Sequence, residues 1–248
     1  MASYEDLSNR LVLITGGANG IGQAMVEAFH TQGAIVSFCD LDQAGGKRLV
    51  KRLGKRISFT KVDLTRELDI KRWVAKEAKR YGNIHVLVNN AARDPRSKLE
   101  NIKVKAWDDL FAGNLRAYFL TCREASPHLA ENASIINFSS ITFHNGPEEM
   151  SAYVATKSAT IGLTRSLARE LGPRRIRVNT ISPGWIMTNR QLKEYVSSSI
   201  KRELKKIQCI PDLNQPEEVA EVALFLASDV SRAVTGQEIL VDRGWTHS

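Results

Sequence analysis

The sequence predicts an α/β protein built on a doubly wound, seven-stranded parallel sheet with helices on both faces. Short β-branched runs alternate with amphipathic stretches of helical length along the whole chain. No internal repeat, low-complexity segment or Pro/Gly-rich linker interrupts the alternation. A chain of 248 residues, 43% hydrophobic and 25% charged, has the size of one such domain. We therefore expect residues 1–248 to form a single domain.

The alternation assigns each element in turn. Buried strands are expected at Leu11–Thr15, Ala34–Cys39, Ile57–Val62, His85–Asn90, Ser134–Ser139, Ile176–Ile181 and Glu238–Asp242. Helices are expected at Gly20–Gln32, Gln43–Leu53, Glu67–Tyr81, Lys105–Ala130, Met150–Leu171 and Pro216–Ser228. Four helices are followed by a glycine where a left-handed C-cap is favoured, at Gly33, Gly54, Gly82 and Gly172. Repeated strand–helix units predict a parallel sheet whose ligands bind at the carboxyl ends of the strands, where the winding reverses.

Composition argues against several classes of protein. The formal net charge of +8 comes from basic clusters in separate, helical stretches without interleaved aromatic residues, which predicts solvated helix faces and no nucleic-acid partner. No apolar run approaches the roughly 20 residues that span a bilayer, so no membrane association is expected. Acidic residues precede the first apolar stretch, unlike a secretory signal. Three distant cysteines suit a reducing cytoplasm, and five scattered histidines predict no metal site.

A glycine-rich loop, TGGANGIG at residues 15–22, joins the first strand to the first helix. Gly16, Gly20 and Gly22 allow a tight turn, close approach of the backbone to a pyrophosphate, and close packing of the helix on the strand. The context of strand, loop and helix is the one that a dinucleotide site requires. No lysine follows the loop, so it is not the phosphate loop of a nucleoside triphosphatase.

The end of the second strand, FCDLD, predicts which dinucleotide binds. Asp40 lies 18 residues beyond Gly22, where an acid accepts hydrogen bonds from the adenosine ribose and repels a 2′-phosphate. No basic residue stands at Ala18 or Asn19, so NAD is expected over NADP. The alternative for Asp40 is a helix N-cap, a role that Asp42 fills better. Asp63, after the third strand, is expected near the adenine.

The stretch SAYVATK places Tyr153 and Lys157 four residues apart, a little over one helical turn. An ammonium group beside a phenol favours the phenolate, so Lys157 is expected to lower the pKa of Tyr153 toward the range of a general base. The spacing alone is weak evidence, because it also arises on ordinary helix surfaces.

Several motifs in order and spacing give the chain a family resemblance. TGGANGIG, NNAA (residues 89–92), Asn114, FSS with Ser140, YVATK and SPGWIMT (residues 182–188) resemble the short-chain dehydrogenase/reductase family over nearly the whole chain. Two positions depart from the family pattern: Ala92 replaces a usual glycine, and Arg243-Gly244 replaces a double glycine. The resemblance implies a Rossmann fold and an oxidoreductase.

The resemblance also implies roles for individual residues. Tyr153 would be the catalytic acid/base, Lys157 would lower its pKa and bind the nicotinamide ribose, and Ser140 would orient the substrate oxygen. Asn114 would hold a water that joins Lys157 to solvent. The expected cofactor-binding residues are Gly16, Asn19, Gly20, Ile21, Gly22, Asp40, Leu41, Asp63, Leu64, Asn90, Ala91, Tyr153, Lys157, Pro183, Gly184, Ile186 and Thr188.

The segment at about 188–213 is expected to be a mobile lid that shapes the substrate pocket. Its sequence, with NNAARD, resembles the branch of the family that oxidises free aldoses at the anomeric carbon. The candidate substrate residues are Asp94, Ser140, Thr142, Asn145, Glu148, Trp185, Asn189, Arg190 and Gln191. The alternatives are a 3-oxoacyl-thioester reductase, which would prefer NADPH, and a non-catalytic dinucleotide-binding protein. Small residues along 158–168 would permit close helix contact, and members of the family that the chain resembles usually form tetramers. We therefore expect a homo-oligomer, either a dimer or a tetramer.

Overall fold

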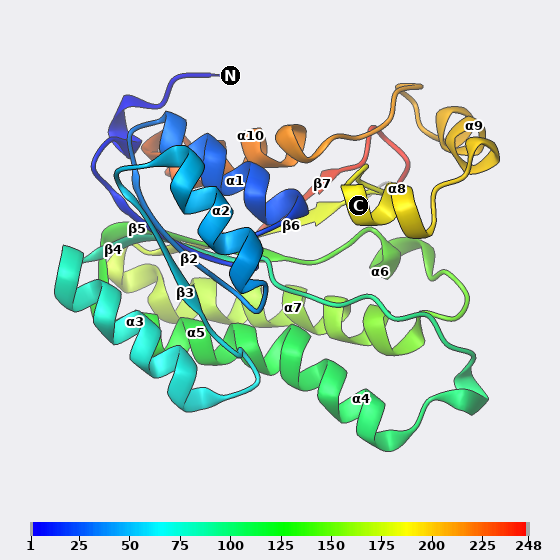
Figure 1. Cartoon of the computed structure of the whole chain (residues 1–248), viewed down its shortest axis with the longest axis horizontal. Helices are drawn as coiled ribbons and strands as arrows, with labels where there is room; N and C mark the ends of the chain where they lie inside the picture. Colours follow the sequence, from blue (N-terminus) through cyan, green and yellow to red (C-terminus); the bar gives the residue numbers. More distant parts are fainter. Residues whose placement is uncertain (1, 247–248) are drawn as a thin grey trace.

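The computed structural model describes residues 2–246, which form one α/β domain around a seven-stranded sheet (Figure 1). The strand order is β3-β2-β1-β4-β5-β6-β7, and all of the pairings are parallel. The strands are β1 (Leu11–Thr15), β2 (Ile35–Asp40), β3 (Ile57–Lys61), β4 (Ile84–Asn89), β5 (Leu129–Phe138), β6 (Arg177–Pro183) and β7 (Glu238–Val241). The winding reverses between β1 and β4, so the doubly wound sheet expected from the sequence is confirmed.

Helices cover both faces of the sheet, and each face has its own apolar core (Figure 1). One layer consists of α1 (Gly20–Thr31), α2 (Gln43–Leu53) and α10 (Pro216–Ala227). The opposite layer consists of α3 (Glu67–Tyr81), α5 (Ala117–Ala125) and α7 (Ser151–Leu171). Because both faces are covered, the central strands are apolar on both sides, and all five residues of β1 are buried.

Three of the four glycines expected as left-handed C-caps have the positive φ that favours glycine, but Gly54 and Gly82, with ψ values of −122° and −146°, lie outside the left-handed helical region. Gly33, Gly54 and Gly82 have φ values of 76°, 78° and 86°. The expectation for Gly172 is wrong, because its φ of −54° is helical. A 3₁₀ turn continues the chain from Gly172, and Arg175, with φ 57°, takes the left-handed conformation instead.

The helix expected over residues 105–130 continues only to Ala125, and its middle turn is π-helical. The chain instead forms α4 (Val104–Phe111), a π-helical turn (Ala112–Arg116) and α5, and β5 already begins at Leu129. Pro127 lies in a 3₁₀ turn that ends α5, since proline cannot continue a helix. The π turn carries Asn114, whose side chain is bound by groups outside the helix.

A helical segment follows β6 and lies at one end of the molecule, beyond β6 and β7 (Figure 1). It contains α8 (Asn189–Glu194) and α9 (Ser198–Ile207), while the short α6 (Thr142–Asn145) follows β5. The segment has a small apolar cluster of its own, built around Met187, Val196 and Leu204. Between residues 2 and 246, no helix is long and apolar enough to cross a membrane.

Candidate active site

A cavity of about 1400 Å³ opens at the carboxyl ends of β1, β4 and β5. Its position beside the reversal between β1 and β4 is where ligands of a doubly wound sheet bind. All the residues that the sequence analysis assigned to catalysis, cofactor or substrate line this one cavity, from Gly16 in the glycine loop to Gln191 in α8. Groups up to 175 positions apart in the chain therefore share one site, by the difference between those two residue numbers.

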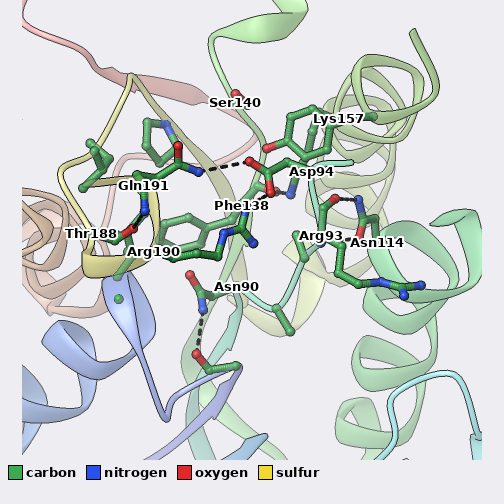
Figure 2. Close-up of a pocket in the computed structure, with 18 of the residues that line it drawn as sticks. Asn90, Arg93, Asp94, Asn114, Phe138, Ser140, Lys157, Thr188, Arg190 and Gln191 are labelled. Atoms are coloured by element: carbon green, nitrogen blue, oxygen red, sulfur yellow. Dashed lines mark hydrogen bonds and ion pairs between the residues drawn. The ribbon is translucent and has the colours of Figure 1, made fainter. Parts of the chain in front are cut away.

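The glycine loop has the geometry of a phosphate cradle. Gly16 and Gly20 have φ values of 68° and 56°, and a Cβ on Gly22 would lie only 1.9 Å from the carbonyl oxygen of Gly16. Asn90 ties the loop to the end of β4, because its Nδ2 donates to the carbonyl oxygens of Thr15 and Gly16, each at 3.1 Å (Figure 2). The backbone can thus approach a pyrophosphate closely at the N-terminus of α1.

The carboxylate of Asp40 stands at the adenosine end of the cavity. Its Oδ2 accepts a hydrogen bond from the backbone of Ala18 at 3.0 Å, and its Oδ1 accepts one from the backbone of Asp42. Asp42 is the N-cap of α2, as expected, and also accepts a bond from Asn19. Leu41 presents an apolar surface beside them, since 60% of it is exposed where it lines the cavity. These groups fit the adenosine half of a dinucleotide.

The amine of Lys157 is held beside the ring of Tyr153 by a main-chain carbonyl and a second tyrosine. Its Nζ donates to the carbonyl oxygen of Phe138 at 2.7 Å and to the hydroxyl of Tyr118 at 3.5 Å, and it lies 5.7 Å from the centre of the Tyr153 ring. Burial lowers the pKa of Lys157 to about 7, so near neutral pH this amine carries only part of a charge.

The pKa of the Tyr153 phenol is shifted by its burial and by three polar or charged side chains. Burial raises the pKa of Tyr153 above its ordinary value, and a hydrogen bond with Ser140 opposes that shift. Asp94 raises the pKa further, and Arg190 lowers it. The buried amine of Lys157 donates to a main-chain carbonyl, so the lowering of the Tyr153 pKa by Lys157 stays a prediction.

Asn114 joins the loop after β4 to α7. Its Nδ2 donates to the carbonyl oxygen of Arg93 at 2.8 Å and to the hydroxyl of Thr156 at 3.3 Å, while its Oδ1 accepts from the backbone of Arg93 (Figure 2). Thr156 in turn donates to the carbonyl oxygen of Tyr153 at 2.7 Å. The side chain of Asn114 thus holds the wall of the cavity against the helical turn that carries Tyr153.

Four candidate substrate residues form one connected polar cluster. The carboxylate of Asp94 pairs with the guanidinium of Arg190 and accepts a hydrogen bond from Gln191 at 3.1 Å (Figure 2). Gln191 accepts a bond from the indole of Trp185 at 2.9 Å. Thr142 lies close to Ser140, because its backbone donates to the hydroxyl of Ser140 at 3.2 Å. Asn145, Glu148 and Asn189 also line the cavity.

Several residues of the site were missed from the sequence. The carbonyl of Phe138, which accepts a hydrogen bond from Lys157, could not be identified from the sequence, because every residue type carries the same main-chain carbonyl. Tyr118 was detectable, since it lies four residues after Asn114 and both side chains point into the protein. Arg96 stacks on the rings of Tyr195, at 4.2 Å, and Trp185, at 5.3 Å, but nothing in its polar sequence neighbourhood indicated that contact.

The fold and the site define a dinucleotide-binding oxidoreductase. A family model described as enoyl-(acyl carrier protein) reductase matches residues 16–246. With the tyrosine, lysine, serine and asparagine gathered at the cavity, this match shows that the chain belongs to the short-chain dehydrogenase/reductase family, whose dehydrogenases use NAD(P).

Named relatives are similar over almost their full length. The chain is 40% identical to a probable galactose dehydrogenase of Rhizobium meliloti, covering 98% of this chain and 97% of the relative. It is 37% identical to a D-xylose 1-dehydrogenase of Caulobacter vibrioides, covering 98% of each. A 3-oxoacyl-[acyl-carrier-protein] reductase of Chlamydia pneumoniae is 34% identical over 97% of this chain and 98% of the relative. A solved short-chain dehydrogenase of Brucella melitensis, described as a glucose/ribitol dehydrogenase, covers both chains completely with 32% identity and a TM-score of 0.91.

Proposed function

We propose that the protein is an NAD-dependent aldose 1-dehydrogenase, which oxidises the anomeric carbon of a free sugar to the lactone. The observation that carries the proposal is the polar cluster of Asp94, Arg190 and Gln191 in the same cavity as Ser140 and Tyr153. A sugar pocket needs such groups, because each buried hydroxyl without a partner costs about 1–3 kcal/mol. The names of the galactose and xylose relatives support the same substrate class.

In this proposal Tyr153 accepts the proton of the anomeric hydroxyl, and Ser140 donates a hydrogen bond to that oxygen. The two groups stabilise the alkoxide character that develops as the carbon loses its hydride. NAD, when bound, supplies the hydride acceptor. Lys157, with a pKa of about 7, is suited to pass a proton on from Tyr153 at neutral pH.

Asn114 is the proposed link to solvent. Both side-chain donors of Asn114 are occupied by Arg93 and Thr156, so the water expected from the family resemblance would be held by its main chain. The open hydrogen-bond pattern of the π turn at residues 112–116 suits such a role, since π turns expose main-chain groups at functional sites.

The preference for NAD is proposed to rest on Asp40. A 2′-phosphate on the ribose would meet this carboxylate, and like charges repel. Replacing Asp40 by Ala should reduce the ratio of kcat/KM values for NAD over NADP. An unchanged ratio in that variant would mean that Asp40 does not select the cofactor.

The substrate class is tested by a panel. Reduction of NAD is measured with aldoses, polyols and secondary alcohols, and oxidation of NADPH with a 3-oxoacyl thioester. The proposal expects turnover of at least one aldose with NAD and its loss in Tyr153→Phe. Turnover of the thioester with NADPH and of no aldose would establish the alternative, which the reductase relative and the family description favour. Dinucleotide binding without any turnover would indicate a binding protein.

We also propose a homo-oligomer that assembles through α4, α5 and α7. These helices border a groove of about 780 Å³ whose walls include Trp107, Phe111, Phe119, Ala159 and Leu163. Phe119 is 45% exposed, and a Cβ on Gly162 would meet nothing within 4 Å, so a second α7 could approach closely. Ultracentrifugation of Phe119→Asp tests this interface.

We also propose a cytoplasmic location, since Cys39, Cys122 and Cys209 are free thiols.

A further inference from the structure

The loop after β4 holds the α8 segment through two separate contacts. The first is the bond of Asp94 to Arg190 and Gln191, which closes the front of the cavity (Figure 2). The second is Arg96, whose guanidinium stacks on the rings of Trp185 and Tyr195. Both contacts join residues 94–96 to residues 185–195, on opposite sides of the site. They are the kind of contact that must break before α8 can move away.

The Asp94 carboxylate also faces the catalytic groups. Figure 2 shows it between Lys157 on one side and Arg190 with Gln191 on the other. Its side chain is only 20% exposed, so water screens its charge poorly, whereas Arg190 is 46% exposed and can swing into solvent with α8. Opening of the pair would therefore separate a half-buried negative charge from its positive partner.

We propose that the Asp94–Arg190 pair is an electrostatic latch: closed, it cancels the charge of Asp94, and open, it leaves that charge beside Tyr153 and prevents the phenol from giving up its proton. Proton removal from the substrate is thereby restricted to the state in which α8 covers the cavity. Asp94 and Arg190 act through Tyr153 and are positioning residues. The latch regulates the site described under the proposed function, and so it rests on that function.

The signs of the individual influences agree with this coupling. Among the influences on the pKa of Tyr153, Asp94 raises it and Arg190 lowers it, after burial and the bond with Ser140. Asp94 also raises the pKa of Lys157, against the larger effect of burial. The other titratable or charged groups around Tyr153 come from four elements: Tyr118 on α5, Arg93 and Arg96 on the loop after β4, Glu148 and Glu149 before α7, and Lys157 on α7 itself.

The test uses three variants and their pH–rate profiles at saturating sugar and NAD. Arg190→Gln should move the rising limb of kcat to higher pH, because Asp94 then lacks its partner. Asp94→Asn should move the limb to lower pH, because the remaining charge at Arg190 favours the phenolate. Each shift should be about 0.5 to 1 pH unit. The double variant should return close to the wild-type profile. Glu194→Gln is the matched control, since Glu194 also pairs with Arg190, at 3.5 Å, but leaves the latch intact.

Two readouts do not depend on turnover. Hydrogen exchange of residues 188–195 should be faster in Asp94→Asn and Arg190→Gln than in the control, as expected for an opened latch. Absorbance titration of the phenolate, with the signal of Tyr153→Phe subtracted, should give the same opposite shifts as the rate profiles. If no sugar is oxidised, the proposed function fails, but the titration still decides the latch.

Opposite shifts that cancel in the double variant support the latch, because the mere loss of a structural contact would move both single variants in the same direction. Shifts of the same sign, or no shift in either variant, would overturn it. Unchanged hydrogen exchange in both single variants would equally refute it, since the pair would then not hold α8 in place.

Discussion

The sharpest structural prediction concerns the third glycine of the phosphate cradle. In Gly22→Ala the new Cβ would lie 1.9 Å from the carbonyl oxygen of Gly16 and 2.8 Å from Nδ2 of Asn90. Cβ atoms in proteins essentially never approach closer than 3.0 Å, so the Cβ and this oxygen must separate by at least a further 1.1 Å, which is 3.0 minus 1.9. The movement also strains the bond that Asn90 donates to the same oxygen.

The cost of this substitution follows from overpacking, which typically destabilises a protein by about 1–3 kcal/mol. In a chain of this length, each kcal/mol lowers the melting temperature by about 2–4 °C, so a decrease of about 2–12 °C is expected. The affinity for NAD, measured by calorimetry, should fall about tenfold or more. Binding must restore the displaced loop, and a cost of about 1.4 kcal/mol already corresponds to a tenfold loss of affinity.

Gly172→Ala is the matched control for Gly22→Ala. Gly172 has a helical φ of −54°, and an added Cβ would meet nothing within 4 Å. This variant should melt close to the wild type, because the gain from alanine restricting the unfolded chain is offset by the contact of its Cβ with Pro173, which disfavours the helical conformation before proline. Wild-type melting and NAD affinity in Gly22→Ala, or equal destabilisation in the two variants, would refute the reasoning.

Four further variants, at three positions, probe stability. Because burial lowers the pKa of Lys157 from 10.5 to about 7, the unfolded chain binds the extra proton between these values, and wild-type stability should rise with pH through this window. The melting-temperature gain of Lys157→Met over the wild type should accordingly be larger at pH 7 than at pH 10; an equal gain would disprove a neutral buried amine. Asp42→Ala should cost about 1 kcal/mol in urea unfolding by removing the cap of α2, while Asp42→Asn should keep most of it. Arg177→Met should cost about 3 kcal/mol, because the buried guanidinium donates four hydrogen bonds at the end of α10, and a thermal melt like that of the wild type would contradict this estimate.

Elements with a strong local pattern were predicted well. The helices over 43–53 and 67–81 have the expected bounds, because their apolar stripe and terminal glycine are both local signals. The glycine loop was identified for the same reason, since its spacing and its place between strand and helix are properties of consecutive residues. The position of the cavity followed from topology alone, once the strands were known to be parallel.

The failures occurred where distant residues compete with local preference. The π turn within the helix coincides with Asn114, whose side chain bonds the backbone of Arg93, a contact across 21 positions that no local pattern indicates. The chain from Gly172 stays helical for a further turn, although glycine favours a left-handed cap there. Lys157 and Tyr153 share a helix face, as predicted, but the carbonyl of Phe138 in β5, which accepts a hydrogen bond from the Lys157 amine, was not foreseen from the local sequence.

Periodicity, glycine spacing and a handful of motifs in the chain by themselves predicted the sheet, its helical layers and most of the residues that line the cavity. These signals are local, and burial of an apolar stripe or a left-handed turn depends little on what lies elsewhere. Only the tertiary structure decided how the site is charged. The proton affinity of Tyr153 depends on burial, on Asp94 from the loop after β4 and on Arg190 from α8, and Coulomb interactions follow distance in space, which order along the chain does not specify.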